Sequence, residues 1–458
     1  MWLGLLCFGS ALSAQTNFTT LVSHGSDSNR VNVVFLAEGY RTNQYAQFLT
    51  DATNAASQLL TNAPYAEYTN YVNVHAIAVP SVQSGSDHPA SGYYSNTFFN
   101  STYGASEYFM SIPPNDYDAS YNNGQGKVDA LLATYLPQAD LAILLVNDNA
   151  PGGSDGGGKT AIVSRGAVTG PFYGILPHET GHVFAGLGDE YTTPNPGYPD
   201  IEEPNTTRET NRAAIKWRAW ISTNTPVPTP PTSEYLNAVG LFEGAHYHTN
   251  GWYRPKINCM MGSFGVGFCE VCQEAMVLAC YRQVRPIDSF TPASTNLSTT
   301  TNQPLNFALT LLQPSTHALA VQWLTNGAAA ANATNANFSI APVALGNGTN
   351  TVTASVMDPT PLVRTDTSNL LSQTRSWTVT VSIPMLQLSA PHTVPGGGFA
   401  FRVSGVAPAG FAVQASANLA AWTSLTTNML VNGQFDYTNF GGSNLPIRLF
   451  RAITPPGP

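Results

Sequence analysis

The sequence predicts a multidomain protein in which one α/β domain is followed by two small all-β sandwich modules of the Ig-like type. Two observations support this prediction. Before Pro286, apolar segments with strand spacing alternate with segments of helical spacing; after Pro286, Thr, Asn, Ala and Ser dominate and apolar residues recur at alternate positions. The expected boundaries in the 458 residues are 1–14 for a signal peptide, 15–285 for the α/β domain, 286–385 for the first module and 386–458 for the second.

In the α/β domain, wholly apolar runs predict central strands, and apolar residues three or four apart predict helices that cover the sheet. Strands are expected at 31–40, 72–81, 141–146 and 160–164, and helices at 45–60, 128–136 and 172–187. In the β-modules, period-two stretches predict strands within 318–327, 350–358 and 376–384, and then within 399–405, 410–425, 433–440 and 446–453.

Few residues are charged: 10% of the chain, against roughly 25% in an average soluble domain. This composition excludes a coiled coil and a charge-rich disordered chain, and the net charge of −9 argues against a nucleic-acid partner. The charge is also uneven, because the first 285 residues hold 13 Lys and Arg against 23 Asp and Glu, and no Lys or Glu follows Pro286. The acidic surplus therefore belongs to the α/β domain.

The N-terminal segment MWLGLLCFGSALSA is apolar and ends in small residues, as a secretory signal does. The alternative is a buried N-terminal strand, because no Lys or Arg precedes the apolar run. We expect a secreted, cell-surface or periplasmic protein. The mature chain has no other apolar stretch of 18–20 residues, so no membrane span is expected.

Four cysteines remain after removal of the signal, and all lie within 22 residues: Cys259, Cys269, Cys272 and Cys280. In an exported chain, an even number of clustered cysteines predicts two disulfides that hold one loop-rich segment. A structural zinc site is the alternative. It is disfavoured because the Cys-x-x-Cys pair lacks a second pair at the spacing of a zinc ribbon.

The segment LPHETGHVFAGLGDEY contains the pattern His-Glu-x-x-His. On a helix, His178 and His182 lie one turn apart on the same face and can bind one cation, and Glu179 can take a proton from water at that cation. A zinc peptidase needs a third protein ligand. Asp189 is the first candidate and Glu190 the second, because glycine stands six residues after His182, where the metzincin pattern has its third ligand. His246 and His248 are more distant alternatives.

Met260 and Met261, followed by a glycine, fit the Met-turn that forms an apolar floor under the zinc ligands of metzincins. Tyr191 and Tyr253 are candidates for stabilising a developing oxyanion, although packing explains them equally well. Asp148 and Asp155 are potential Ca²⁺ ligands, but ordinary turn chemistry accounts for them too.

These motifs resemble the IgA-peptidase family of zinc metallopeptidases, metzincin-like enzymes that are mainly exported bacterial proteins. The similarity runs in order from Val31 to Met276, through VNVVFLAEGY, DLAILLVND, HETGHVFAGLGDEY, VGLFEGAHYHTNGWYRP, NCMM and FCEVCQEAM. It implies a zinc-dependent endopeptidase in which His178, His182 and Asp189 hold Zn²⁺, Glu179 is the general base and Met260–Met261 form the Met-turn. Glu38 stands where the family pattern has Asp, which we expect to matter little.

The expected activity is hydrolysis of peptide bonds by metal-activated water. The substrate peptide would lie extended along an edge strand at Thr160–Ser164. Cleavage of IgA itself is not expected to follow from the resemblance, because the chain has little room for the N-terminal β-module that family members often carry. The alternatives are a non-catalytic adhesin or glycan-binding protein and a zinc amidase that acts on a cell-wall component. A surface polysaccharide or protein is the expected ligand of the C-terminal modules.

Overall fold

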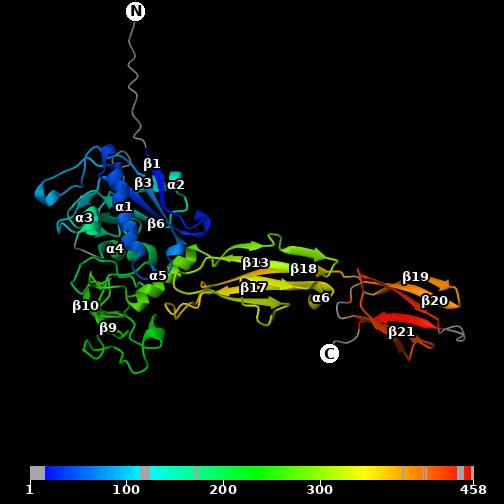
Figure 1. The fold of residues 1–458 in the computed structure, drawn as a ribbon. Coiled ribbons are helices and arrows are strands. Elements are labelled where there is room, and N and C mark those ends of the chain that lie inside the picture. Colours follow the sequence, from blue (N-terminus) through cyan, green and yellow to red (C-terminus); the bar gives the residue numbers. More distant parts are fainter. Residues whose placement is uncertain are drawn as a thin grey trace, which may run out of the picture. The chain divides into compact units, whose positions relative to one another are not determined.

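The structure is a computed structural model that describes residues 16–113, 124–170, 174–383, 386–405, 407, 410–440 and 448–454 (Figure 1). The predicted signal peptide, residues 1–14, lies outside the described residues. The chain divides into two compact units. The first takes the chain up to Asp288 together with Leu312–Leu319 and Met357–Ser372, and the second holds Ser289–Leu311, Ala320–Val356 and the chain from Gln373 onward. Both returning segments lie within 286–385, the predicted range of the first β-module.

A six-stranded sheet is the framework of the first unit, with strand order β1-β3-β2-β6-β8-β7. Its strands are β1 (Asn17–Val22), β2 (Val31–Glu38), β3 (Val72–Ala78), β6 (Leu141–Val146), β7 (Gly153–Ser154) and β8 (Ala161–Ser164). The four central strands are parallel, and β1 and β7 run antiparallel to their neighbours at the two edges. Strand β8 therefore lies between β6 and β7, and the prediction that Thr160–Ser164 is an edge strand is wrong.

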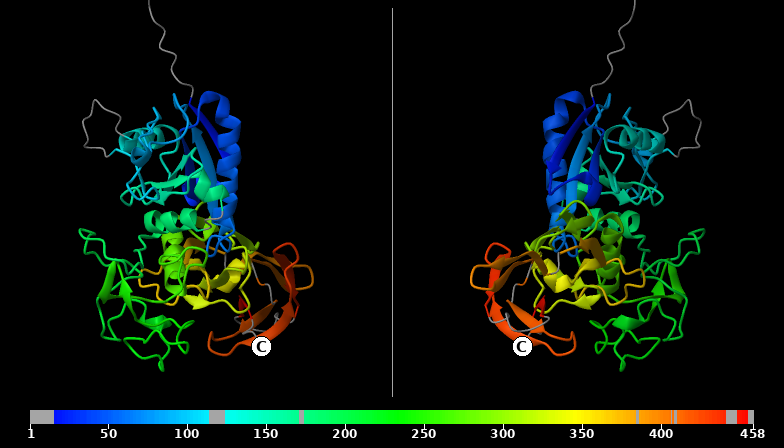
Figure 2. Two further views of the ribbon diagram at one scale, coloured as in Figure 1. Left: turned by 90° about the vertical axis from the view of Figure 1, so that its left-hand side faces the viewer. Right: turned by 90° about the vertical axis from the view of Figure 1, so that its right-hand side faces the viewer.

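Both faces of this sheet are covered, which is why its central strands are apolar without interruption. Val33 and Phe35 of β2 share one core with α1 (Tyr45–Leu60), α3 (Arg165–Thr169), α4 (Ile175–Ala185) and α5 (Glu270–Gln283). Val34 and Leu36 point to the opposite face and share a second core with α2 (Gly124–Tyr135). Figure 2 shows α1 and α2 on opposite sides of the strands.

The rest of the first unit is largely irregular. It contains two short hairpins, β4 (Thr102–Tyr103) with β5 (Met110–Ser111), and β9 (Phe242–Ala245) with β10 (His248–Arg254). Single 3₁₀ turns occur at Asp27–Asn29, Thr42–Gln44, Thr69–Tyr71, Pro89–Ser91 and Arg218–Trp220.

The second unit is built from small sheets, consistent with sandwich modules. One pair has strand orders β11-β13-β16 and β12-β18-β17-β14-β15, and Phe307 of the smaller sheet contacts Trp323 and Trp377 of the larger. The elements are β11 (Ile287–Thr291), β12 (Asn296–Thr299), β13 (Leu305–Leu311), β14 (Ala320–Thr325), β15 (Ala328–Ala329), β16 (Asn337–Ile340), α6 (Pro342–Leu345), β17 (Gly348–Met357) and β18 (Ser372–Val381).

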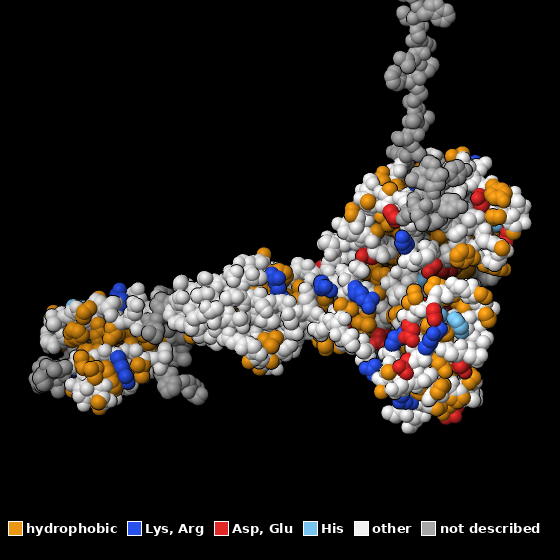
Figure 3. Space-filling model, turned by 180° about the vertical axis from the view of Figure 1, so that it is seen from behind, with side chains coloured by type: hydrophobic (Ala, Val, Ile, Leu, Met, Phe, Trp, Pro, Cys, Tyr) orange, Lys and Arg blue, Asp and Glu red, His pale blue; other side chains and the backbone are white. Residues whose placement is uncertain are grey.

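The second pair of sheets has strand orders β19-β20-β23 and β22-β21-β24, and Phe401 and Phe411 lie in the core that they share. The strands are β19 (Gln387–Val394), β20 (Gly398–Ser404), β21 (Phe411–Ser416), β22 (Thr423–Asn428), β23 (Gln434–Asn439) and β24 (Leu449–Ile453). On the face drawn in Figure 3, acidic side chains gather over the first unit, and the β-modules present mainly uncharged surface. Among the described residues, no helix is both long and apolar enough to cross a bilayer.

Glu38, at the end of β2, holds a loop of the first unit in place. Its carboxylate is fully buried and accepts hydrogen bonds from Thr97 Oγ1 at 2.5 Å, the Phe99 N–H at 2.9 Å and the Ser101 N–H at 2.8 Å. Burial raises the pKa of Glu38 above its usual value, and these donors oppose that shift. The Glu38 carboxylate thus has a structural function, and the expectation that Glu in place of Asp matters little stays a prediction.

We expect Glu38→Ala to lower the free energy of unfolding by roughly 2–6 kcal/mol, because two buried backbone N–H groups lose their acceptor at about 1–3 kcal/mol each. Glu38→Gln keeps one acceptor oxygen and should lose less. Denaturant unfolding measures the loss, and hydrogen exchange of residues 97–101 locates it. Unchanged stability and unchanged amide protection in Glu38→Ala would contradict the assignment.

Candidate active site

Helix α4 carries His178, Glu179 and His182, and glycines define its two ends. Gly174 precedes the helix with φ 114°, and Gly186 ends it in the left-handed region with φ 64°. The N–H of Gly186 donates to the carbonyl of His182 at 2.9 Å, and the left-handed conformation of Gly186 ends the helix less than one turn after the second histidine. The four-residue spacing then places both imidazoles on one face.

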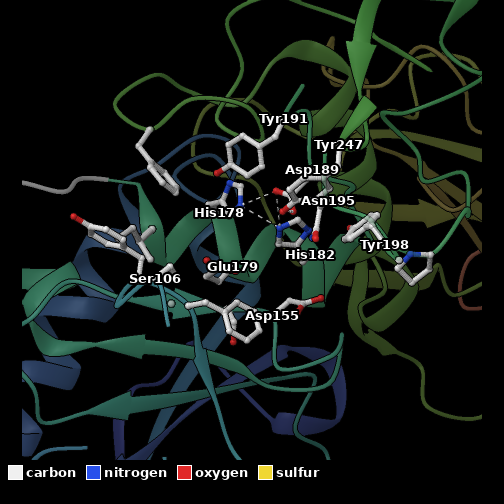
Figure 4. A pocket seen from close by; sticks show the side chains of 18 of the residues that line it. Ser106, Asp155, His178, Glu179, His182, Asp189, Tyr191, Asn195, Tyr198 and Tyr247 are labelled. Carbon is white, nitrogen blue, oxygen red and sulfur yellow. Dashed lines mark hydrogen bonds and ion pairs between the residues drawn. The ribbon is translucent and has the colours of Figure 1, made fainter. Parts of the chain in front are cut away.

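Three side-chain atoms converge on one point beside this face (Figure 4). The Nε2 atoms of His178 and His182 lie 3.1 Å apart, and Asp189 Oδ1 lies 3.2 Å and 3.4 Å from them, respectively. Tetrahedral ligands at zinc–nitrogen distances of about 2.0–2.1 Å are separated by about 3.3 Å. The donor set and its spacing therefore fit a divalent zinc ion.

The remaining nitrogen of each imidazole fixes the tautomer. His178 Nδ1 lies 3.0 Å from the carbonyl oxygen of Met260, and His182 Nδ1 lies 2.6 Å from that of Leu187. Because a carbonyl oxygen only accepts, each Nδ1 carries a proton, and Nε2 is the atom that each neutral imidazole can offer to a cation. When both rings are neutral, two lone pairs and a carboxylate oxygen face one another, an arrangement that a bound cation stabilises.

Asp189 and Glu190, the two candidates for the third ligand, point in different directions in the structure. Asp189 lies with the histidines, and its other oxygen, Oδ2, accepts a hydrogen bond from the Tyr247 hydroxyl at 2.7 Å. Glu190 points the opposite way, toward Cys259, Cys269 and Cys272. The N–H of Glu190 donates to the carbonyl of Met261 at 2.8 Å, which fixes this division. The geometry thus favours Asp189 over Glu190 at the histidine pair.

The pKa values of His182, Asp189 and Glu179 are all shifted in the site. Burial opposes the charged form of His182, yet the hydrogen bond and the attraction to Asp189 raise its pKa to about 9. Burial alone would raise the pKa of Asp189, but His178 and His182 together lower it below its usual range. Burial also raises the pKa of Glu179 to about 7, despite the opposing effect of the histidines. A carboxylate with that pKa is suited to exchange protons near neutral pH.

Strand β7 limits the space around Glu179. A Cβ atom on Gly153 would lie 2.6 Å from Ile175 Cγ2 and 3.1 Å from Glu179 Oε1. Only glycine therefore fits here without displacing the helix or the carboxylate. The glycine-rich segment before β8 thus supplies a backbone strand that lies directly against α4.

The Met-turn residues lie under the helix. Met260 and Met261 are buried, and a Cβ on Gly181 would contact Met261 Sδ at 3.3 Å. Met261 therefore packs against α4 between the two histidines, and Met260 contributes its carbonyl oxygen to His178. Both residues therefore lie against the helix that carries the histidines, and their role as a Met-turn stays a prediction.

An open cleft of about 730 Å³ contains this cluster. Its rim carries large apolar side chains that are well exposed, with Tyr108 at 60%, Phe109 at 56% and Phe264 at 43%. The residues that line it are Ser106, Tyr108, Phe109, Gly153, Ser154, Asp155, Ile175, His178, Glu179, His182, Asp189, Tyr191, Asn195, Pro196, Gly197, Tyr198, Pro199, Tyr247 and Phe264.

Of the other residues proposed from the sequence, some line the cleft and others lie outside it. Tyr191 lines the cleft, with its ring 5.9 Å from that of His178, whereas Tyr253 pairs with the backbone of Thr207 outside it. His246 bonds to the carbonyl of Pro199 and His248 to that of His246. Neither histidine belongs to the metal-ligating groups found among the described residues.

The two candidate calcium ligands have local partners. Asp148 Oδ2 lies 3.1 Å from His88 Nε2, and its Oδ1 accepts from the Ala150 N–H at 2.9 Å. Asp155 accepts from the Gly157 N–H at 3.1 Å. The bonds to Ala150 and Gly157 are turn contacts, and the contact with His88 is an ion pair with a distant loop. Neither residue joins a group of potential metal ligands in the described part of the chain.

The cysteines differ from the prediction of two disulfides, because all four are free thiols in the structure. Cys259, Cys269 and Cys272 lie together, but Cys280 lies elsewhere and faces an apolar pocket beside Tyr65 and Phe184. Three clustered sulfurs and a distant fourth cannot form two bridges.

Tyr247 is a residue of the site that the sequence did not predict. His246 and Tyr247 both adopt left-handed backbone conformations, with φ 53° and 57°, and the N–H of Tyr247 bonds to the carbonyl of Tyr191. This turn brings the Tyr247 hydroxyl to Asp189. No periodic pattern marks such a position, and within the run AHYHTNGW only the two histidines are of a residue type that suggests a metal ligand.

The geometry agrees with the comparison against protein families. Residues 19–237 and 231–279 match the model of one family, which consists of metallopeptidases. That family is IgA Peptidase M64, and the chain belongs to it. The similarity to this family noted in the sequence is thereby confirmed, and with it a peptidase with protein substrates. No curated protein sequence matches the chain significantly.

Two solved structures show weak likeness. The apo structure of Bacteroides uniformis beta-glucuronidase 3 is 9% identical with a TM-score of 0.14, and the match covers 45% of this chain and 28% of that one. A chaperone-tip adhesin complex of CFA/I fimbriae biogenesis is 10% identical with a TM-score of 0.14, covering 35% of this chain and 93% of that one. At these scores neither likeness supports an argument about fold or function.

We expect Tyr247→Phe to weaken metal binding at the histidine pair by about 10–100-fold, because Asp189 loses the hydrogen bond that orients it. Competition with a chromogenic chelator measures the affinity of the metal that His182→Ala removes. Tyr198→Phe is the matched control, since Tyr198 packs against Tyr247 in the same cleft and its loss leaves the Tyr247–Asp189 bond intact. Equal affinities in the two variants would refute the role of Tyr247.

Proposed function

We propose that this protein is an exported zinc-dependent endopeptidase whose active site is the cluster on α4. The observation that supports this most is the convergence of His178 Nε2, His182 Nε2 and Asp189 Oδ1 beside Glu179. Three protein ligands and an accessible cleft leave a coordination position for water, as catalytic zinc sites require. Export is supported by the N-terminal apolar segment.

His178, His182 and Asp189 would hold the zinc ion, which would supply Lewis-acid chemistry at this site. Glu179 accepts the proton of the attacking water and then delivers it to the leaving nitrogen. Its raised pKa favours both transfers near neutral pH, because neither protonation state is strongly disfavoured. Tyr191, beside His178 in the cleft, is positioned to donate to the carbonyl oxygen as its negative charge develops.

The metzincin-like character of the domain is part of the proposal and rests on the Met-turn beneath α4 and on the edge strand beside it. Strand β7 and the adjoining residues Tyr108 and Phe109 line the cleft opposite the histidines. We infer that an extended peptide lies along this rim, where its apolar side chains contact Phe109 and Phe264. An extended substrate places an internal peptide bond over Glu179, so endopeptidase activity follows from the open cleft.

Glu179→Gln should reduce the kcat for cleavage of a protein substrate by about 10²–10⁴-fold, because the amide cannot accept the proton of the attacking water. Both metal ligands on α4 remain, so the variant should keep its zinc. A casein or gelatin assay measures cleavage, and elemental analysis measures zinc.

Glu234→Gln is the control, since it removes an exposed carboxylate outside the cleft and should leave cleavage unchanged. Cleavage by Glu179→Gln at the wild-type rate would overturn the proposed mechanism. A wild type that hydrolyses a cell-wall amide but no protein would overturn the substrate class.

A further inference from the structure

We propose that Glu190, Cys259, Cys269 and Cys272 form a second metal site, a structural zinc site distinct from the cluster of His178, His182 and Asp189. The four residues come from three separate segments: the turn after α4, the segment before the Met-turn and the start of α5. One ligand atom from each lies within 4.8 Å of all the others.

The sulfur spacing fits shared coordination better than it fits covalent pairing. Cys272 Sγ lies 3.5 Å from Cys259 Sγ and 3.6 Å from Cys269 Sγ. Tetrahedral thiolates bound to zinc at about 2.3 Å are separated by about 3.8 Å, whereas a disulfide requires about 2.05 Å. Cys272 Sγ also lies 3.8 Å from Glu190 Oε1, so the carboxylate completes a four-membered donor set.

The four side chains are buried, and a bound cation would compensate the cost of burying the carboxylate. Cys259 and Cys272 are fully buried, Cys269 is 3% exposed and Glu190 is 1% exposed. Glu190 Oε1 accepts a hydrogen bond from Asn205 at 2.9 Å, but its Oε2 is buried with no hydrogen-bond partner. The nearby Arg254 donates to the main-chain carbonyl of Glu190 at 2.7 Å, not to this orphaned oxygen. A buried carboxylate atom without a partner is costly unless it binds a metal or a charge.

The ligand chemistry selects zinc among the common ions. Three thiolates and one carboxylate oxygen are a soft set, which excludes Ca²⁺ and Mg²⁺ because these ions require all-oxygen ligands. Four protein ligands leave no open position, as in structural zinc sites. The three thiols release their protons as the ion binds.

The position of this site predicts that the ion stabilises the turn that carries Asp189. Asp189 and Glu190 are neighbours, and the ion at Glu190 would hold the turn from the side opposite the cleft. It would tie this turn to Cys259, which directly precedes the Met-turn, and to α5. Asp189 and Met261 would thus be anchored by one ion behind the active site.

Elemental analysis of the purified full chain tests the proposal by counting zinc. We expect about two zinc ions per wild-type chain, about one in Cys272→Ser and about one in the double variant His178→Ala/His182→Ala. Cys280→Ser is the matched control, because Cys280 is equally buried but faces an apolar pocket away from the cluster, and it should retain both ions. The proposal is overturned if the wild type holds a single ion that the double variant loses.

A second measurement on the wild type serves if Cys272→Ser does not fold. After chelation of the metal, every cysteine of the denatured protein should react as a thiol, five in the full chain and four once the segment that contains Cys7 is removed, with an intact mass that indicates no oxidation. A mass lower by that of two hydrogens, with two thiols missing, would establish a disulfide instead and refute the site. Replacement of zinc by Co²⁺ should also give a thiolate-to-cobalt charge-transfer absorption that persists in the double histidine variant; its absence there would count against the proposal.

Discussion

The site depends on one constraint: two adjacent carboxylates must face in opposite directions. Helix α4 stops at Gly186, and the chain turns so that Asp189 reaches the two histidines while Glu190 turns away into the interior. The bond from the Glu190 N–H to the Met261 carbonyl fixes that division, because rotating the backbone to exchange the two side chains would break it. Helix, Met-turn and α5 are all positioned around this one peptide segment.

Burying so many ionisable groups is tolerable only because a rigid framework surrounds them. Isolated charges in the interior are costly, so each must be paired, hydrogen-bonded or metal-bound. The sheet provides this rigidity, since its apolar strands pack against helices on both faces and hold α4 in a fixed orientation. Gly153 then allows β7 to approach Glu179 closely, which keeps the carboxylate buried at the edge of an otherwise open cleft.

Local patterns made part of this structure predictable. Helix α1 and strand β6 have the predicted bounds, Tyr45–Leu60 and Leu141–Val146, because periodicity within a single segment defines both. Strand β7 escaped prediction because two residues in a glycine-rich run carry no periodicity, and its omission made β8 look like an edge. The two histidines lie within one helical turn, so their pairing could be predicted from the sequence, whereas Glu190 is 69 to 82 residues away from the three cysteines that it approaches. Spacing alone therefore favoured disulfides, and only the fold separates Cys280 from the other three.

A metal ion bound by Glu190 and the three cysteines would stabilise the long connection between Asp189 and the Met-turn. Between α4 and β9 the described chain has one 3₁₀ turn, Arg218–Trp220, and loops of that length without regular structure are uncommon in compact domains. Hydrogen bonds between distant residues hold it instead: the side chain of Asn205 bonds to the N–H and the carbonyl of Gly188, and the backbone N–H of His246 donates to the carbonyl of Asp189. Because Asn195–Pro199 of this connection line the cleft, the contacts that fix Asp189 also fix the wall that faces the substrate.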